Sequence, residues 1–217
     1  MKVIKRSGLS VPMKFDAVVA RISKLTTGLS NSVDTTKVAQ KVFSSMHDGI
    51  STQEIDSLSA EIAIGMITED SDYEVLATRI VASNIQKNAP KTFSAAMRGL
   101  HDDGILGDDA WETILTNKTE LNGSINHALD FKFGYFGLKT LEKGYLMGGE
   151  TPQYLIMRVA VGIHGDNLEK VLETYEYPFD MYSYVSRTFS KRTSTCRTGT
   201  SFTRPPRCST QPRRSHS

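Results

Sequence analysis

Two adjacent cations near the N-terminus, Lys5 and Arg6, are the first residues whose type and position could do chemistry. They end a short strand-like run and precede several predicted helix starts. Cationic side chains attract a polyphosphate, and the free backbone N–H groups of a helix start give it oriented donors. The pattern therefore predicts a polyphosphate site. By itself it is also typical of a solvated strand edge, so both interpretations stay open.

Other chemistry-bearing residues give weaker signals. His164, in GIHGD, could be a metal ligand or a general base, but with no other His or Cys nearby in the sequence we favour a surface loop. The pairs Asp102-Asp103 and Asp108-Asp109 lack the ligand alternation of a calcium loop. The chain has no P-loop, nucleophile elbow or zinc-binding pattern. We therefore expect no metal site and no catalytic residue.

The elements that must position Lys5 and Arg6 are a β-hairpin and four helices. The runs 2–6 and 9–13 are strand-like, and Ser7-Gly8 between them is a suitable turn. Apolar residues at helical spacing predict helices that begin near residues 15, 35, 52 and 72. We expect Asp16 to cap the first helix, a Ser51–Glu54 capping box to start the third, and Ser71 to repeat that signal.

The sequence beyond Asn88-Ala89-Pro90 is predicted to be almost wholly helical over residues 91–176, with loops at 102–108 and 147–152. The aromatic pair Tyr135-Phe136 is most simply part of a core. The predicted architecture is mainly α, with a first domain over 1–92 and a second over 93–176.

The C-terminal segment differs from the rest in composition. From Met181 onward there are 8 Lys and Arg and no Asp or Glu, which leaves 18 basic and 24 acidic side chains in residues 1–180. Both cysteines, Cys196 and Cys208, lie in this segment, so a disulfide framework is excluded for the body. A segment this poor in aliphatic residues cannot offset its ordering entropy, and we expect 177–217 to be disordered. No apolar run is long enough to span a bilayer, which favours a soluble, cytoplasmic protein.

Taken together, several segments resemble the class I ribonucleotide reductase large subunit, and its ATP-cone in particular. The cone-like segments are VIKRSG (3–8), FDAVVARI (15–22), STQEIDSLSAEIA (51–63) and DYEVLATRIVASNIQK (72–87). The segments FKFGYFGLKTLEKGYL (131–146) and MRVAVGIHGDN (157–167) resemble the reductase helices that follow the cone. The resemblance implies a helical bundle with a small β-hairpin lid, then the reductase N-terminal helical domain.

That resemblance also implies a function. The family reduces ribonucleoside diphosphates to deoxyribonucleotides with a cysteine thiyl radical, and its cone binds ATP or dATP, with Mg²⁺, as an allosteric effector. By resemblance the effector-binding residues would be Lys5 and Arg6 at the phosphates, Phe15, Asp16 and Val18 along the base and ribose, and Thr52, Asp56 and Lys87 at further contacts. Two positions depart from the family: Val11 replaces a frequent Glu and Ala17 a frequent Lys.

The partners implied are a nucleotide effector, further copies of the large subunit and a radical-generating small subunit, with no membrane and no nucleic acid. No catalytic cofactor is expected, and we expect the chain to be inactive alone because the family's reactive cysteines would follow the segment present here. A stand-alone regulatory module or the product of a decayed gene are the alternatives.

The segment 177–217 contains a further indication of the family when its codons are read in another frame. The family continues with a motif close to HASPTLFNAG. Pairing the third base of each codon with the first two of the next, from Phe202 to Gln211, permits HASPTLFNA without a break. We therefore predict a frame change within 177–201. A genuine basic, nucleic-acid-binding tail is the alternative.

Overall fold

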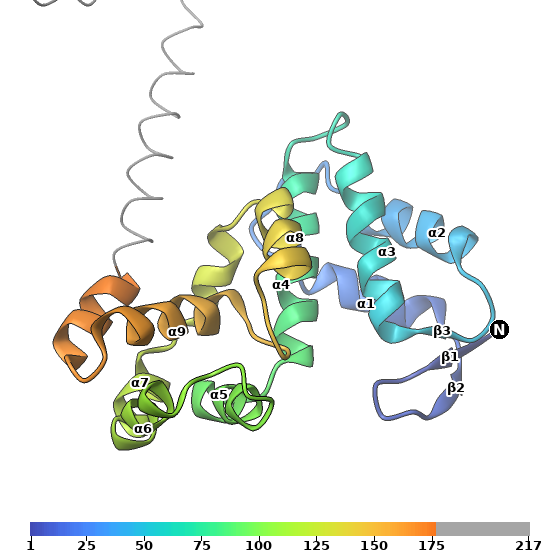
Figure 1. The fold of residues 1–217 in the computed structure, drawn as a ribbon. Coiled ribbons are helices and arrows are strands. Elements are labelled where there is room, and N and C mark those ends of the chain that lie inside the picture. Colours follow the sequence, from blue (N-terminus) through green and yellow to red (C-terminus); the bar gives the residue numbers. More distant parts are fainter. Residues whose placement is uncertain (177–217) are drawn as a thin grey trace, which may run out of the picture. The chain divides into compact units, whose positions relative to one another are not determined.

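The computed structural model describes residues 1–176, which fall within one compact unit (Figure 1). The segment 177–217, and with it the predictions of disorder and of a frame change, lies outside the described residues. Within the described residues no helix is both long enough and apolar enough to cross a membrane.

The N-terminal hairpin forms as predicted. Strand β1 (Lys2–Ile4) pairs antiparallel with β2 (Ser10–Pro12), with Val3 opposite Val11. The turn between them needs a left-handed residue, and Gly8, at φ +78°, supplies it without steric cost. The short strand β3 (Ile50–Ser51) adds to the other edge of β1 in parallel, so the sheet order is β2-β1-β3.

Four helices lie under this small sheet: α1 (Phe15–Ser23), α2 (Thr35–Ser45), α3 (Thr52–Gly65) and α4 (Asp72–Asn88). The apolar faces of these helices form one core with the sheet. Its almost fully buried residues include Val3 of β1, Ile22 of α1, Val38 of α2 and Leu76 of α4. The predicted capping box is present: the Ser51 hydroxyl accepts from the Glu54 N–H at 3.1 Å, and the Glu54 carboxylate accepts from the Ser51 N–H at 2.8 Å.

Two predicted caps are wrong. Asp16 lies inside the first turn of α1, whose N-cap residue is Lys14 and carries no side-chain cap. Ser71 precedes α4 but makes no side-chain cap, because its backbone is already helical and the carboxylate of Asp70 accepts from the Asp72 N–H instead. The acidic residues in these first turns still stabilise the helices, because negative charge interacts favourably with the positive end of the helix dipole.

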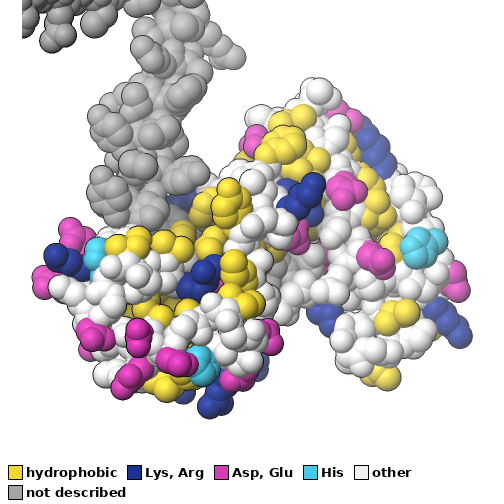
Figure 2. Space-filling model, viewed as in Figure 1, with side chains coloured by type: hydrophobic (Ala, Val, Ile, Leu, Met, Phe, Trp, Pro, Cys, Tyr) yellow, Lys and Arg dark blue, Asp and Glu magenta, His cyan; other side chains and the backbone are white. Residues whose placement is uncertain are grey.

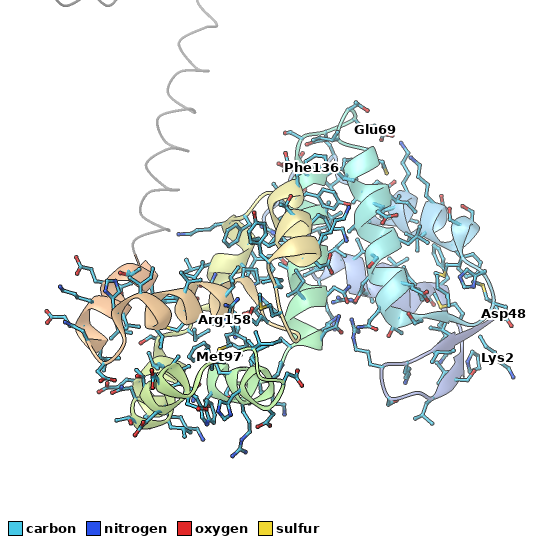
Figure 3. All side chains as sticks on the ribbon, in the orientation of Figure 1. Lys2, Asp48, Glu69, Met97, Phe136 and Arg158 are labelled. Atoms are coloured by element: carbon cyan, nitrogen blue, oxygen red, sulfur yellow. The ribbon has the colours of Figure 1, made fainter. Side chains whose placement is uncertain are left out.

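The second part of the described chain is helical, as predicted, and has its own core. Its elements are α5 (Phe93–Asp102), α6 (Asp108–Thr116), α7 (Lys118–Ser124), the 3-10 helix η1 (His127–Lys132), α8 (Tyr135–Gly144) and α9 (Pro152–His164). A further helical stretch covers 168–176. Met97, which Figure 3 labels, is fully buried in this second core, as are Tyr154 and Met157.

Helix α8 follows the predicted domain boundary at residue 92 in the sequence, but it packs on the first domain. Tyr135 and Leu138 join the first core, because α8 packs on α4 (Figure 1), while α5, α6, α7, α9 and the stretch 168–176 supply the second core. The two predicted domains therefore touch through α4, and the boundary itself stays a prediction. Phe136 corrects one expectation: Tyr135 is buried, but Phe136 is 70% exposed and points away from the fold (Figure 3).

His164 is also placed differently from the prediction. It ends α9 rather than lying in a surface loop, it is half-buried, and its Nε2 lies 2.6 Å from the Thr174 hydroxyl. On the face shown in Figure 2, hydrophobic side chains gather in the middle of the described chain, and acidic side chains are most numerous at the lower left.

Candidate functional site

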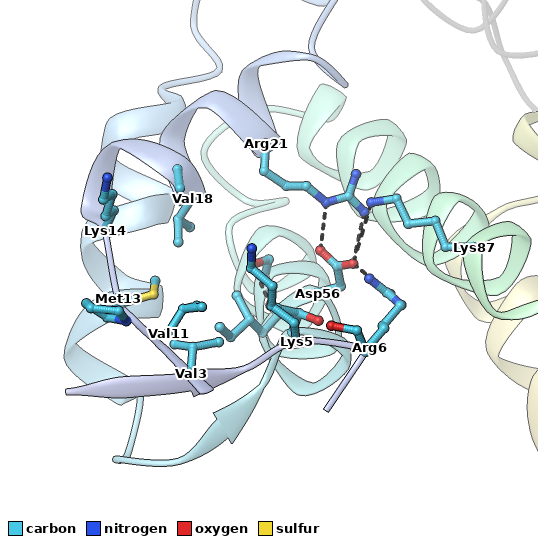
Figure 4. A pocket seen from close by; sticks show the side chains of 16 residues that line it. Val3, Lys5, Arg6, Val11, Met13, Lys14, Val18, Arg21, Asp56 and Lys87 are labelled. Carbon is cyan, nitrogen blue, oxygen red and sulfur yellow. Dashed lines mark hydrogen bonds and ion pairs between the residues drawn. The ribbon is translucent and has the colours of Figure 1, made fainter. Parts of the chain in front are cut away.

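A cavity of about 820 Å³ lies beneath the hairpin, between the starts of α1 and α3 and the end of α4 (Figure 4). Its size is that of a small-molecule site. The residues that line it are Val3, Lys5, Arg6, Ser7, Val11, Pro12, Met13, Lys14, Ala17, Val18, Arg21, Thr52, Ile55, Asp56, Ser59 and Lys87.

Asp56 is the centre of the polar side of this cavity. Its side chain is only 7% exposed, and both of its oxygens accept from Arg21, at 2.9 Å each (Figure 4). Arg6 Nη2 donates to Asp56 Oδ2 at 3.2 Å, and Lys87 Nζ lies 3.9 Å from the same oxygen. One buried carboxylate is thus shared by three cations from three different elements.

The cations of the cavity exceed its anions. Lys5 and Lys14 line it together with Arg6, Arg21 and Lys87, whereas Asp56 is the one acidic residue among the described residues of its lining. Burial lowers the pKa of the Lys87 ammonium; Asp56 opposes this shift, and Arg21 and Arg6 add to it by repulsion. Unbalanced positive charge in a partly buried cavity attracts an anion.

Arg6 connects the hairpin to the last turn of α4. Its Nη2 donates to Asn84 Oδ1 at 2.5 Å and its Nε donates to Asn88 Oδ1 at 2.9 Å. These bonds fix the guanidinium in place before a ligand arrives, which lowers the ordering cost of binding.

Matches to known families cover both parts of the chain. Residues 1–88 match the ATP cone domain, and residues 131–192 match the ribonucleotide reductase all-alpha domain. The chain belongs to the ribonucleotide reductase large-subunit family.

Relatives of this reductase segment come from distant organisms. It is 41% identical over 190 residues to a ribonucleoside-diphosphate reductase large chain of Saccharomyces cerevisiae, covering 81% of this chain and 22% of the yeast protein. It is 37% identical over 210 residues to the large subunit of Caenorhabditis elegans, covering 90% and 27%. It is 39% identical over 190 residues to the large subunit of Arabidopsis thaliana, covering 81% of this chain and 23% of the plant protein. The chain thus spans about a quarter of the length of these relatives.

Most of the residues expected to bind the effector lie together. Six of the eight line the cavity: Lys5, Arg6, Val18, Thr52, Asp56 and Lys87. Phe15 and Asp16 do not. Phe15 packs edge-on against Phe43 of α2, with ring centroids 5.9 Å apart, and Asp16 is exposed. Helical spacing is the reason, because Lys14, Ala17, Val18 and Arg21 share the face of α1 that meets the cavity.

Sequence reasoning missed Arg21 and Lys14. The signal was available, since Arg21 follows Val18 by three residues and Ala17 by four, and so shares their helical face. Both family departures, Val11 and Ala17, are in the cavity lining. They make this wall of the cavity apolar.

Proposed function

We propose that this segment of a reductase large subunit binds ATP or dATP in the cavity beneath its hairpin, as an allosteric effector. The observation that carries the proposal is the shared Asp56 carboxylate, which gathers Arg6, Arg21 and Lys87 at one end of a ligand-sized cavity. The matched ATP cone domain supports a nucleotide as the ligand.

The residues suggest an orientation for the nucleotide. Arg6, Arg21 and Lys87, with Lys5, would face the triphosphate, because guanidinium and ammonium groups form charge-assisted hydrogen bonds with phosphate oxygens. The Thr52 hydroxyl at the start of α3 adds a polar contact beside a helix N-terminus. The apolar wall of Val11, Ala17 and Val18 would contact the base and ribose.

Magnesium fits this cavity only together with the phosphates. Both oxygens of Asp56 are already paired with cations, and the described residues contain no cluster of three metal-ligating side chains. In the proposed site the ion would be held by phosphate oxygens and water.

Calorimetry on the full chain tests the proposal. ATP should bind the wild type, and the double variant Lys5→Ala/Arg6→Ala should bind it about 10- to 100-fold more weakly, since the net loss of even one charged hydrogen bond costs about 1.5–3 kcal/mol. The matched control, Lys37→Ala/Lys41→Ala, removes two cations that pair with Glu69 outside the cavity and should leave the affinity unchanged. Equal affinity of wild type and Lys5→Ala/Arg6→Ala would contradict the proposal.

The wider reaction is proposed from the relatives, whose names describe reduction of ribonucleoside diphosphates. We propose that this segment supplies effector binding and contacts to further large subunits and to the small subunit, in the cytoplasm, and does not itself reduce substrate. Radical reduction needs cysteines held rigidly beside the ribose. The sequence offers only Cys196 and Cys208. Conversion of CDP to dCDP by the purified chain with a small subunit and reductant would contradict this.

A further inference from the structure

The last turn of α4 has a second polar contact on the side away from the cavity. Gln86 Nε2 donates to Asp130 Oδ2 at 2.7 Å and to the His127 carbonyl at 2.9 Å, both in η1. Gln86 directly precedes Lys87, which faces the cavity. The same helical turn therefore contacts the pocket and the reductase helical segment.

The contact between Gln86 and Asp130 is sensitive to displacement, because Asp130 is buried. Its side chain is fully buried, and its Oδ1 accepts from Gln153 Nε2 of α9 at 3.0 Å. Gln153 in turn accepts from the Tyr175 hydroxyl at 2.8 Å. A buried carboxylate needs its donors, so a small displacement of Gln86 is costly. We name Gln86, Asp130, Gln153 and Tyr175 the Asp130 network.

Helix geometry separates the two contacts of this turn. At 100° per residue, Asn84, Lys87 and Asn88 fall within about 100° of one another, and Gln86 projects about 150° from the middle of that group. Arg6 bonds Asn84 and Asn88 on the pocket side, while Asp130 bonds Gln86 on the opposite side. The turn is held between the two.

Without a bound anion, the cationic side chains of Arg6, Arg21 and Lys87 on the pocket side of the turn repel one another. Arg21 and Arg6 lower the pKa of Lys87 through their charge, and one carboxylate serves all three cations. A bound polyphosphate would offset this repulsion and leave the Arg6 bonds to Asn84 and Asn88 in place. The end of α4 would then be held more firmly.

We infer that the last turn of α4 couples the pocket to the Asp130 network, so that a nucleoside triphosphate bound under the hairpin tightens the docking of η1 and α9. This inference rests on the proposed function. Coupling is reciprocal: whatever the ligand adds to the network, the network adds to the affinity for the ligand.

Hydrogen exchange on the full chain, with and without ATP, tests the coupling. In the wild type, ATP should slow amide exchange in the cone and also in η1, at 127–132. In Gln86→Met, which keeps the length of the side chain but removes the donor, ATP should slow exchange in the cone alone. By reciprocity, Gln86→Met should weaken ATP binding about fivefold, at the lower end of typical coupling.

The matched control is Asn122→Ala. Asn122 joins α7 to α5 through two bonds with Ser94, away from the last turn of α4, so its loss should leave ATP affinity unchanged. ATP binding to the wild type with no slowing in η1 would overturn the coupling and leave the proposed function standing. No ATP binding to the wild type would overturn both. The wild-type exchange result stands even if Gln86→Met does not fold.

Discussion

Asp56 and Asp130 are both buried carboxylates, but their partners differ. Asp56 is bonded by two guanidiniums, with an ammonium 3.9 Å away, and it borders an open cavity. Asp130 is bonded by the carboxamides of Gln86 and Gln153, and the nearest ring nitrogen of a histidine, His127 Nδ1, lies 3.6 Å away. The first arrangement leaves positive charge for a ligand, and the second closes a protein interface.

The largest expected effect of this difference is on stability. Asp130→Ala leaves the buried Gln153 Nε2 donor without its acceptor, removes one of the two bonds of Gln86 Nε2, and should lower the free energy of unfolding by about 3 kcal/mol. Asp56→Ala should cost about 1 kcal/mol, because Arg6, Arg21 and Lys87 are each 27–38% exposed and can turn to water. Urea unfolding, followed by the single tryptophan, Trp111, measures both. Equal losses would remove the distinction between the two carboxylates.

The second prediction concerns the charge of the cavity beside Asp56 and its effect on ATP affinity. Ala17→Lys adds a cation to the cavity wall and should tighten ATP binding about tenfold, which corresponds to about 1.4 kcal/mol. Ala20→Lys is the matched control, since it adds the same charge to an exposed position of α1 outside the lining. Calorimetry compares the two. Similar gains in both variants would indicate general attraction rather than a contact in the cavity.

The smallest expected effect is a shift in the titration of Lys87. Its pKa lies below the ordinary value of 10.5, chiefly because of burial, and bound ATP should raise it. Because the folded state releases this proton first, stability should rise with pH between the lowered pKa and 10.5, while ATP binding weakens. An NMR titration of the Lys87 side chain, assigned with Lys87→Arg, follows both. A pKa unaffected by ATP would place the phosphates away from Lys87.

How much could be predicted from the sequence depended on the range of the interactions. The hairpin turn at Gly8 and the Ser51–Glu54 capping box are set by neighbouring residues, and both were predicted. The predicted caps at Asp16 and Ser71 are wrong because a shift of two residues in the helix start, or a helical backbone at the capping residue, decides whether a side chain can accept.

The candidate site was predictable in part, through its resemblance to the ATP-cone. The resemblance predicted Lys5, Asp56 and Lys87 as binding residues, and all three line the cavity. It also predicted Phe15, which lies on a different face of α1 from Arg21 and packs on Phe43 instead. The Asp130 network was not predictable, because its bonds join residues 22 to 44 positions apart. Polar pairs at such separations leave no periodic pattern in a single sequence.

A crystal structure of the full chain with ATP tests the central claim most directly. We predict a triphosphate in the cavity beneath the hairpin, with phosphate oxygens at hydrogen-bond distance from Arg6, Arg21 and Lys87 and with the Gln86–Asp130 bond intact. A nucleotide bound elsewhere, or bound here with its base rather than its phosphates at these three cations, would contradict the account.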